Sequence, residues 1–367
     1  MLIGLVIALT WSLSSNNTYS HVTRGQVVRN LQSWGLDSLH AITLNLLLTL
    51  FFLVIGLELA REIQSGRLAN WSSLATPLFA ALGGMACTAI PLLIVGRLTH
   101  SSLMVHGWGI PMATDIALTL GALTLLGPRV PASLRLFVLT LAVLDDVGSV
   151  IALEFVHPVT FEHWVLGTGA LAISLLALRW WRKGYAGAVW IALAGAWIVC
   201  QRFGIEPVLA GVFIGMWARP GQSSALLEKR LTHLSSYFVL PLFTFVATGI
   251  VINSTLFRAG AGRVLLSILL IRLLGKALGI AVGVRLSERV GGVHSELLHG
   301  SVLVGVGFLC AIGFTVPLVF ASAIVPSGTT LYNAITIGLL LASVLGAALG
   351  LLFLSRGLKQ HLGQLGS

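Results

Sequence analysis

The sequence has 367 residues, of which 56% are hydrophobic and only 9% are charged. Because soluble domains carry about 25% charged residues, this composition excludes an ordinary water-soluble domain, and the large apolar fraction excludes a disordered chain. The formal net charge is +10, but no basic run with interleaved aromatic residues indicates nucleic-acid binding. The three cysteines all lie within apolar runs, so no disulfide framework is predicted.

Apolar stretches long enough to cross a bilayer recur along the whole chain. A transmembrane helix needs about 20 predominantly apolar residues, and a window of that length predicts twelve spans. We place them near residues 1–13, 41–60, 74–96, 109–127, 134–156, 163–180, 186–201, 205–218, 237–253, 262–285, 299–325 and 331–354. No connecting segment is long enough to form a soluble domain. The sequence therefore predicts an all-α membrane protein in which residues 1–367 form a single transmembrane domain.

The distribution of lysine and arginine between the connecting segments predicts the orientation. One side carries 14 of them: Arg61, Arg67, Arg129, Arg135, Arg179, Arg182, Lys183, Arg219, Lys229, Arg230, Arg285, Arg289, Arg356 and Lys359. The other side carries 6: Arg24, Arg29, Arg97, Arg202, Arg258 and Arg263. Because basic residues collect in cytoplasmic loops, the first side is predicted to be cytoplasmic, together with both termini.

Four ionisable residues lie at or near the middle of predicted spans: Asp115, Asp145, Asp146 and Lys276. A charge at the bilayer centre costs about 2.5–3.5 kcal/mol on insertion scales. A structural pair would explain one such residue, but four charges in three spans favour a functional site. Lys276 is either a counter-ion for the carboxylates or a snorkelling lysine, and its depth in the span favours the counter-ion.

The fourth and eleventh predicted spans contain helix-breaking residues. In the fourth, Pro111 precedes Thr114 and Asp115. The alternative to an interrupted helix there is a proline kink with Asp115 as a cap. The eleventh span holds three glycines and Pro317 within residues 305–317. Interrupted helices at corresponding positions of two halves point to a transport site, so we predict repeats formed by the third to fifth and the tenth to twelfth spans.

Asp145 and Asp146 are adjacent, so on a helix their side chains point about 100° apart. One of them can line a cavity while the other faces a neighbouring helix. Two carboxylates this close disfavour joint ionisation, and a carboxylate that binds a proton can also exchange it for a metal cation. Because hard oxygen ligands suit hard cations, the pair predicts a site for Na⁺ or Li⁺.

Six segments, in order along the chain, carry a more specific signal. They are FLVIGLELARE at 52–62, ATDIA at 113–117, LDDVG at 144–148, LPLF at 240–243, GKALGI at 275–280 and AIGFT at 311–315. Together they resemble the NhaA family of bacterial Na⁺/H⁺ antiporters, over nearly the whole chain. The resemblance implies twelve helices with inverted repeats, of which the fourth and eleventh are discontinuous and cross at mid-membrane.

The resemblance also implies a role for each site residue. Asp146 would be the main Na⁺-binding carboxylate, and Asp145 would be its partner, paired with Lys276. Thr114 would assist near the cation. Asp115 would offset the positive helix N-termini at the crossing, while Lys276 would balance the negative C-termini. A cytoplasmic cluster would regulate the response to pH, although ordinary helix-end charges are the alternative reading of its members: Glu58, Arg61, Glu62, Glu228 and His233.

The function expected from these residues is exchange of external protons for cytoplasmic Na⁺ or Li⁺, in sodium and pH homeostasis. We expect a multi-pass protein of the bacterial inner membrane that contacts lipid, is not an enzyme and needs no cofactor, and whose segment 14–40 could pair with a second copy. The main alternative is a Na⁺-coupled transporter of organic anions, for which Arg272 is the only candidate anion-binding residue. An intramembrane aspartyl protease is disfavoured because Asp145 and Asp146 are neighbours on one helix. A membrane scaffold without transport would have no use for four buried charges.

Overall fold

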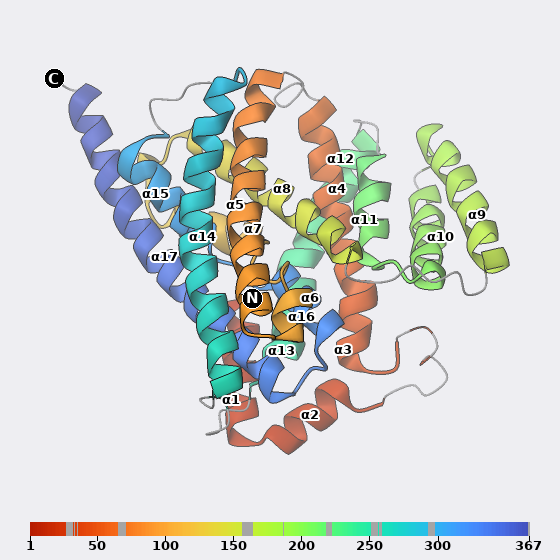
Figure 1. Cartoon of the computed structure of the whole chain (residues 1–367). Helices are drawn as coiled ribbons and strands as arrows, with labels where there is room; N and C mark the ends of the chain where they lie inside the picture. The colour runs from red at the N-terminus through yellow and green to blue at the C-terminus, as the bar shows by residue number, and fades with distance from the viewer. Residues whose placement is uncertain are drawn as a thin grey trace. The chain divides into compact units, whose positions relative to one another are not determined.

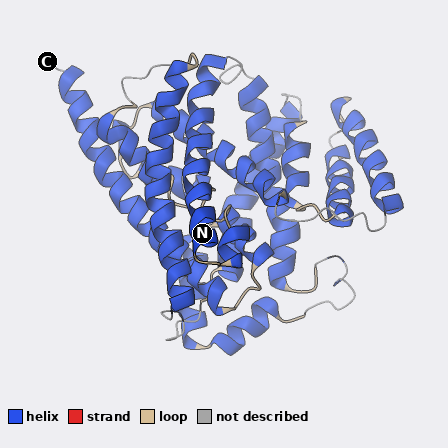
Figure 2. Cartoon of the chain, viewed as in Figure 1, coloured by secondary structure: helices blue, strands red, loops and turns tan. Residues whose placement is uncertain are grey.

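The computed structural model describes residues 1–26, 32, 34, 36–64, 71–155, 164–185, 187–217, 222–250, 256, 259–292 and 298–365. Within these ranges the chain is helical and has no strand; Figure 2 shows only helices and loops. An isolated antiparallel bridge joins Gln26 and Ser38. The predicted all-α class is therefore confirmed for the described part of the chain.

Five helices in the described ranges are long and apolar enough to cross a membrane: Leu39–Arg61, Ser73–Leu98, Ala132–Glu154, Gly260–Arg289 and Thr330–Gln360. Four shorter apolar helices accompany them: Leu2–Ser14, Ala188–Phe203, Gly300–Leu309 and Thr315–Ile324. By their length and composition these helices indicate a multi-pass membrane protein. Each predicted span coincides at least in part with a helix, but the number of twelve crossings stays a prediction.

By its internal contacts the chain forms two compact units, and the single transmembrane domain stays a prediction. The first comprises Met1–Ala69 and Val150–Ile250, and the second comprises Asn70–Ser149 and Val251–Ser367. The two predicted repeats, at 74–156 and 262–354, therefore belong almost entirely to the second unit. All of the predicted transport residues are in that unit, and the predicted pH-response residues are in the first.

The first unit contains short and medium helices. They are α1 (Leu2–Ser14), α2 (Asn16–Arg24), α3 (Leu39–Ile42), α4 (Leu48–Gln64), α9 (Trp164–Arg182), α10 (Ala188–Phe203), α11 (Val208–Met216), α12 (Gln222–Leu234) and α13 (Leu240–Ala247), with π-helical turns η2 (Thr43–Leu47) and η4 (Ser235–Val239). Helix α11 packs on α4, α10 on α9, and α1 on α13. The spans predicted at 205–218 and 237–253 are longer than the helices found, because α11 begins only after Pro207 and α13 ends at Ala247.

The second unit contains the longest helices. They are α5 (Trp71–Leu98), α6 (Ser102–His106), α7 (Ile116–Thr124), the 3-10 turn η3 (Gly127–Arg129), α8 (Ala132–Glu154), α14 (Ala259–Arg289), α15 (Gly300–Leu309), α16 (Thr315–Ile324) and α17 (Thr330–Leu365). Helix α8 belongs to this unit as far as Ser149. Helices α5 and α14 lie side by side (Figure 1). Glycines allow this close approach, since a Cβ atom on Gly279 would overlap the carbonyl oxygen of Gly83.

Two irregular segments interrupt the second unit where the sequence predicted weak helix. Residues 107–115 form turns before α7, so the helix predicted from residue 109 begins only at Ile116. Residues 310–314 separate α15 from α16. The backbone N–H of Asp115 donates to the carbonyl of Ile312 at 2.9 Å, which joins the two segments directly. Buried backbone groups that leave a helix need such partners, and the N–H of Gly313 finds one in the Ser343 hydroxyl at 3.1 Å.

Candidate functional site

The irregular segments of the second unit lie beside a cluster of buried charges. Its ionisable members are at most 2% exposed: Asp115, Asp145, Asp146, Arg272 and Lys276. The aspartates come from the start of α7 and the middle of α8, and both cations come from α14. Four of these five residues were predicted as site residues, and the structure brings them together with the buried hydroxyl of Thr114.

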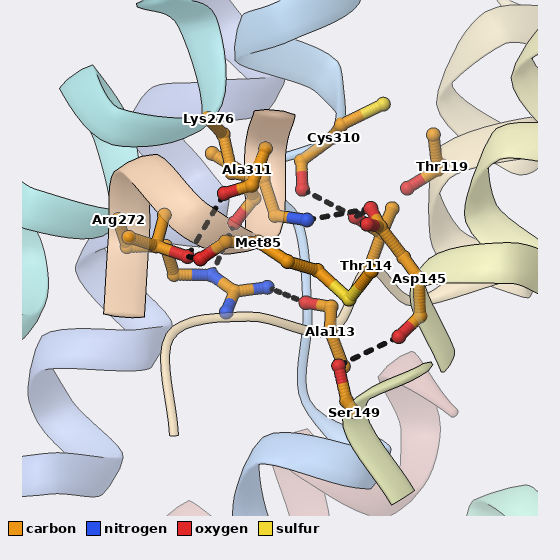
Figure 3. Close-up of polar contacts among 12 residues, drawn as sticks. Met85, Ala113, Thr114, Thr119, Asp145, Ser149, Arg272, Lys276, Cys310 and Ala311 are labelled. Carbon is orange, nitrogen blue, oxygen red and sulfur yellow. Dashed lines mark hydrogen bonds and ion pairs between the residues drawn. The ribbon is translucent and has the colours of Figure 1, made fainter. Parts of the chain in front are cut away.

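Asp145 is held by two side chains on one oxygen. Lys276 Nζ lies 2.5 Å from Oδ2, and the Thr114 hydroxyl donates to the same oxygen at 2.8 Å (Figure 3). Lys276 is fully buried, so it is a counter-ion and does not snorkel. The Thr114 hydroxyl also lies 2.8 Å from the carbonyl oxygen of Cys310. Since a hydroxyl has one proton, it can donate fully to only one of these acceptors at a time.

Asp115 is the N-cap of α7. Its Oδ1 accepts the backbone N–H of Leu118 at 3.2 Å, and its backbone has the extended conformation usual at this position. Asp115 thus acts as a cap, but the backbone before it is interrupted at 107–115 and is not a kinked helix, and the cap uses only one carboxylate oxygen. The other oxygen, Oδ2, is buried in the charge cluster and has no hydrogen-bond partner among the described residues.

Asp146 is the carboxylate of the cluster with the fewest hydrogen-bond donors. Within the described ranges neither of its oxygens has a hydrogen-bond partner, and the same holds for Asp145 Oδ1 and Asp115 Oδ2. Asp146 is close enough to Asp115 and Asp145 for their charges to interact. A buried carboxylate oxygen without a donor is costly, and several such oxygens together form a hard-oxygen environment that suits a small cation or a proton.

A complete cage of protein ligands is not preformed in the described part of the chain. No three His, Cys, Asp or Glu side chains there stand in positions that would hold a metal ion. A bound alkali cation would therefore complete its coordination with the Thr114 hydroxyl, backbone carbonyls or water.

Arg272 is the site residue that sequence reasoning did not assign to the cluster. Its Nε donates to the carbonyl of Ala311 at 2.8 Å, and its Nη2 donates to the carbonyl of Ala113 (Figure 3). The resemblance gave the balancing of helix C-termini to Lys276. In the structure Arg272 contacts Ala311, two residues after the end of α15, while Lys276 pairs with Asp145. The available signal was spacing, because Arg272 precedes Lys276 by one helical turn and shares its face.

The predicted pH-response residues belong to the first unit, and three of them meet. Arg61 Nη1 lies 2.5 Å from Glu228 Oε1, and Arg61 Nη2 lies 3.7 Å from Glu58 Oε1. His233 is exposed on α12 and stacks on Tyr237, with ring centroids 6.1 Å apart. The side chain of the fifth predicted residue, Glu62, lies outside the described residues.

The fold and the buried cluster define a helical multi-pass membrane protein with carboxylates at the depth of its spans. Residues 1–354 match the protein family described as Na⁺/H⁺ antiporter 1. The chain belongs to this family, which confirms the resemblance seen in the sequence.

Individual relatives agree with the family match. The chain is 34% identical over 359 residues to the Na⁺/H⁺ antiporter NhaA of Granulibacter bethesdensis, covering 96% of this chain and 90% of that protein. It is 36% identical over 324 residues to Na⁺/H⁺ antiporter NhaA 2 of Pseudomonas syringae, covering 84% and 81%. The NhaA protein of Pectobacterium atrosepticum is 34% identical over 340 residues, covering 90% and 84%.

Proposed function

We propose that this protein is a Na⁺/H⁺ antiporter that exchanges external protons for cytoplasmic Na⁺ or Li⁺. The observation that carries the proposal is the buried group of carboxylate oxygens without donors, on Asp115, Asp145 and Asp146, beside the counter-ion Lys276. The names of the relatives agree with it. The exchange moves Na⁺ and protons across the membrane and leaves no chemically altered product, so the protein would be a transporter and not an enzyme.

The proposed mechanism is competition for shared oxygens. Asp146 binds either a proton or the cation, and Thr114 adds a neutral oxygen ligand when its hydroxyl turns its proton toward Cys310. Asp145 supplies a second carboxylate whose charge is partly offset by Lys276. Binding of one species lowers the affinity for the other, because both need the same electron pairs. Asp115 caps α7 and adds negative charge.

Transport also requires that the site open to each side of the membrane in turn. We propose that the fourth and eleventh spans, interrupted at 107–115 and 310–314, are the discontinuous helices of inverted repeats and cross near mid-membrane. The hydrogen bond from Asp115 to Ile312 supports this arrangement. Because every proposed transport residue belongs to the second unit, these residues would move together when the site changes its exposure.

The alternative of Na⁺-coupled organic anion transport gains no support. Its anion would require Arg272, but two of the three guanidinium nitrogens of that residue donate to backbone carbonyls. The surrounding carboxylates would also repel an anion.

The decisive experiment measures Na⁺-driven proton movement in everted membrane vesicles with a pH-sensitive dye. Addition of Na⁺ or Li⁺, but not K⁺, should dequench the dye with the wild-type protein. The variant Asp146→Asn should abolish the response, while Asp37→Asn, the same change outside the cluster, should preserve it. Wild-type exchange rates in Asp146→Asn would refute the assignment.

We extend the proposal to regulation by pH. The ion pairs of Arg61 with Glu228 and Glu58 support a charge cluster that responds to pH, with Glu62 and His233 as further members. If this cluster responds to pH, Glu228→Gln should shift the pH dependence of exchange without changing its ion selectivity. An unchanged pH profile in the same vesicle assay would leave these residues as ordinary helix-end charges.

The proposed setting is the bacterial inner membrane, with both termini in the cytoplasm. Besides Na⁺ or Li⁺ and protons, its partners would be membrane lipid and a second copy of the chain in a homodimer. Cross-linking of the protein in native membranes tests the homodimer, because a chain that never yields a dimeric species would exclude it.

A further inference from the structure

Arg272 is buried more completely than its chemistry would ordinarily allow. Its side chain is 0% exposed, and its charge interacts with those of Asp115, Asp145 and Asp146. Burying a charge is costly unless it is paired or hydrogen-bonded. The hydrogen bonds from its Nε and Nη2, however, go to the backbone of the two irregular segments and not to a carboxylate. A residue that served only as a counter-ion for the aspartates would donate its hydrogen bonds to their carboxylates.

We propose that Arg272 is a positioning residue for ion exchange, whose guanidinium ties the carbonyls of Ala113 and Ala311 together and thereby holds Thr114 and Asp115 against the aspartates of α8. The inference rests on the proposed antiporter function and adds a residue to its machinery. Its action is indirect, through the backbone that carries the cation-binding groups.

The two carbonyls that Arg272 binds adjoin the ion-binding groups on both segments. Ala113 immediately precedes Thr114 and Asp115 in the first segment. Ala311 lies between Cys310, whose carbonyl is 2.8 Å from the Thr114 hydroxyl, and Ile312, whose carbonyl accepts the Asp115 N–H. One guanidinium therefore closes a continuous network that joins α14, both segments and α8 (Figure 3). Loss of the guanidinium would leave two buried carbonyls without this donor, and the segments would be free to separate.

Gly313 provides the space that this arrangement requires. A Cβ atom on Gly313 would overlap Arg272 Nη2 and would lie 2.8 Å from the carbonyl oxygen of Ala113. Any residue larger than glycine at this position would push the guanidinium away from Ala113. The two residues are thus predicted to be energetically coupled, although they are far apart in sequence.

Only arginine can make both contacts. Its planar guanidinium presents separate Nε and Nη donors in a rigid fork, whereas the lysine ammonium is a single point donor on a flexible chain. The variant Arg272→Lys therefore preserves the charge near the carboxylates but loses the bridge between the two carbonyls. Arg272→Gln removes the charge and most of the bridge. Comparison of these two variants therefore separates the effect of the carbonyl bridge from the effect of the positive charge.

The test measures the apparent KM for Na⁺, the Vmax and the thermal unfolding midpoint of full-length protein for wild type and variants. A purely structural loss would reduce the amount of active protein, and so Vmax, while leaving KM unchanged. A lost positioning residue should raise KM. We expect Arg272→Gln to raise the KM about tenfold, the loss typical of a hydrogen bond to a charged group. Arg272→Lys should raise it nearly as much, and Arg285→Met, which removes an exposed charge from the same helix, should leave it within about twofold.

Two outcomes would overturn the inference: an unchanged KM in Arg272→Gln, or full restoration of the wild-type KM by Arg272→Lys, which would assign the effect to charge alone. If Arg272→Gln does not fold, Gly313→Ala carries the test with the arginine in place. It should raise the KM in the wild-type background and add little in the Arg272→Lys background, and additive effects would contradict the coupling.

Failure of the antiporter proposal is distinguishable from failure of this inference. A wild-type protein that shows neither exchange nor thermal stabilisation by NaCl over choline chloride would reject the function itself. A wild-type protein that does both, with variants of unchanged KM and unchanged stabilisation by NaCl, would reject only the role of Arg272.

Discussion

The three aspartates of the buried cluster occupy three different environments. Asp145 forms an ion pair with Lys276 and accepts a hydrogen bond from Thr114. Asp115 uses one oxygen to cap α7, and Asp146 has no donor among the described residues. Asp145 and Asp146 differ although they are neighbours, because the helix turns their side chains about 100° apart. Their surroundings, and not their chemistry, thus separate a carboxylate that is stabilised by donors from one that has none.

Tyr19, in helix α2 of the first unit, is a buried polar residue of a different kind. Its hydroxyl donates to the carbonyl of Phe245 at 2.5 Å, its ring packs edge-on against Trp11 and Phe245, and its side chain is fully buried. Helix α2, which carries it, lies outside the predicted spans. Burial raises the pKa of the Tyr19 phenol to about 12, against a smaller opposing effect of Arg24.

This shift predicts how stability depends on alkaline pH. In the folded protein the phenol keeps its proton up to about pH 12, whereas the unfolded chain loses it near 10.0. The unfolded state therefore binds fewer protons in this window, and the contribution of Tyr19 is complete below pH 10 and is lost as the pH rises toward 12, by about 2 kcal/mol. Tyr19→Phe should remove this dependence and cost about 1 kcal/mol at neutral pH through the lost hydrogen bond.

The measurement is the thermal unfolding midpoint of purified wild type and Tyr19→Phe across this pH range. Other groups titrate there in both proteins, so the difference between the two curves is the relevant quantity. The stability advantage of the wild type should shrink above pH 10 and reverse before pH 12, because the loss of about 2 kcal/mol exceeds the hydrogen-bond contribution of about 1 kcal/mol. Parallel curves would show that the phenol does not resist ionisation.

At the scale of elements, the close packing of α5 against α14 depends on glycine. A Cβ atom on Gly279 would overlap the carbonyl of Gly83 and would lie 2.8 Å from Cys87 Cβ. Backbones are rigid, so α5 and α14 would have to separate, and Lys276 is one turn away on the same helix. This interface therefore controls the position of the counter-ion as well as the stability of the unit.

We predict that Gly279→Ala lowers stability by about 1–3 kcal/mol, as expected for overpacking of a close interface. Gly260→Ala is the matched control, because no atom lies within 4 Å of a Cβ built there on the same helix. That control should be neutral or slightly stabilising, since alanine favours helix over glycine. Thermal unfolding of the purified variants distinguishes them, and equal losses in both would exclude the packing explanation.

The interruptions in the second unit were predictable only in part. Pro111 and the glycines of 305–313 break the helix by local chemistry, which any sequence reading can detect. The start of α7 at Ile116 agrees with the alternative reading of Asp115 as a cap, but the non-helical backbone that begins at residue 107 was not predictable, because no proline other than Pro111 stands near it. Likewise the partners of Arg272 are backbone carbonyls from distant parts of the chain. Nothing in the residue types near Arg272 indicates them, whereas the pairing of Lys276 with Asp145 follows from opposite charges at membrane depth.

At the scale of the whole molecule, the asymmetric distribution of lysine and arginine predicts the orientation. The side assigned to the cytoplasm carries 14 of the 22 basic residues and the other side carries 6. The negative surface potential of the cytoplasmic leaflet attracts juxtamembrane basic residues. The bias should therefore hold both termini inside and place the connection around His100 outside.

Single cysteines at exposed positions test this orientation. A membrane-impermeant maleimide should label His100→Cys in right-side-out vesicles and Lys359→Cys only in everted ones, because both side chains are exposed at opposite predicted sides. The parent chain provides the background, since Cys200 and Cys310 are buried and Cys87 is partly so. The reverse labelling pattern would invert the predicted topology.

The two cations on α14 have an electrical consequence. With all five residues of the cluster ionised, Arg272 and Lys276 cancel two of the three carboxylates, and a single negative charge remains. An exchange of one alkali ion for two protons would then alternate between a neutral cluster and one with a single positive charge. The membrane voltage does work of about 2.3 kcal/mol per elementary charge per 100 mV. The voltage should therefore act mainly on the proton-carrying half of the cycle, and a chain with glutamine in place of Arg272 should transfer that sensitivity to the sodium-carrying half.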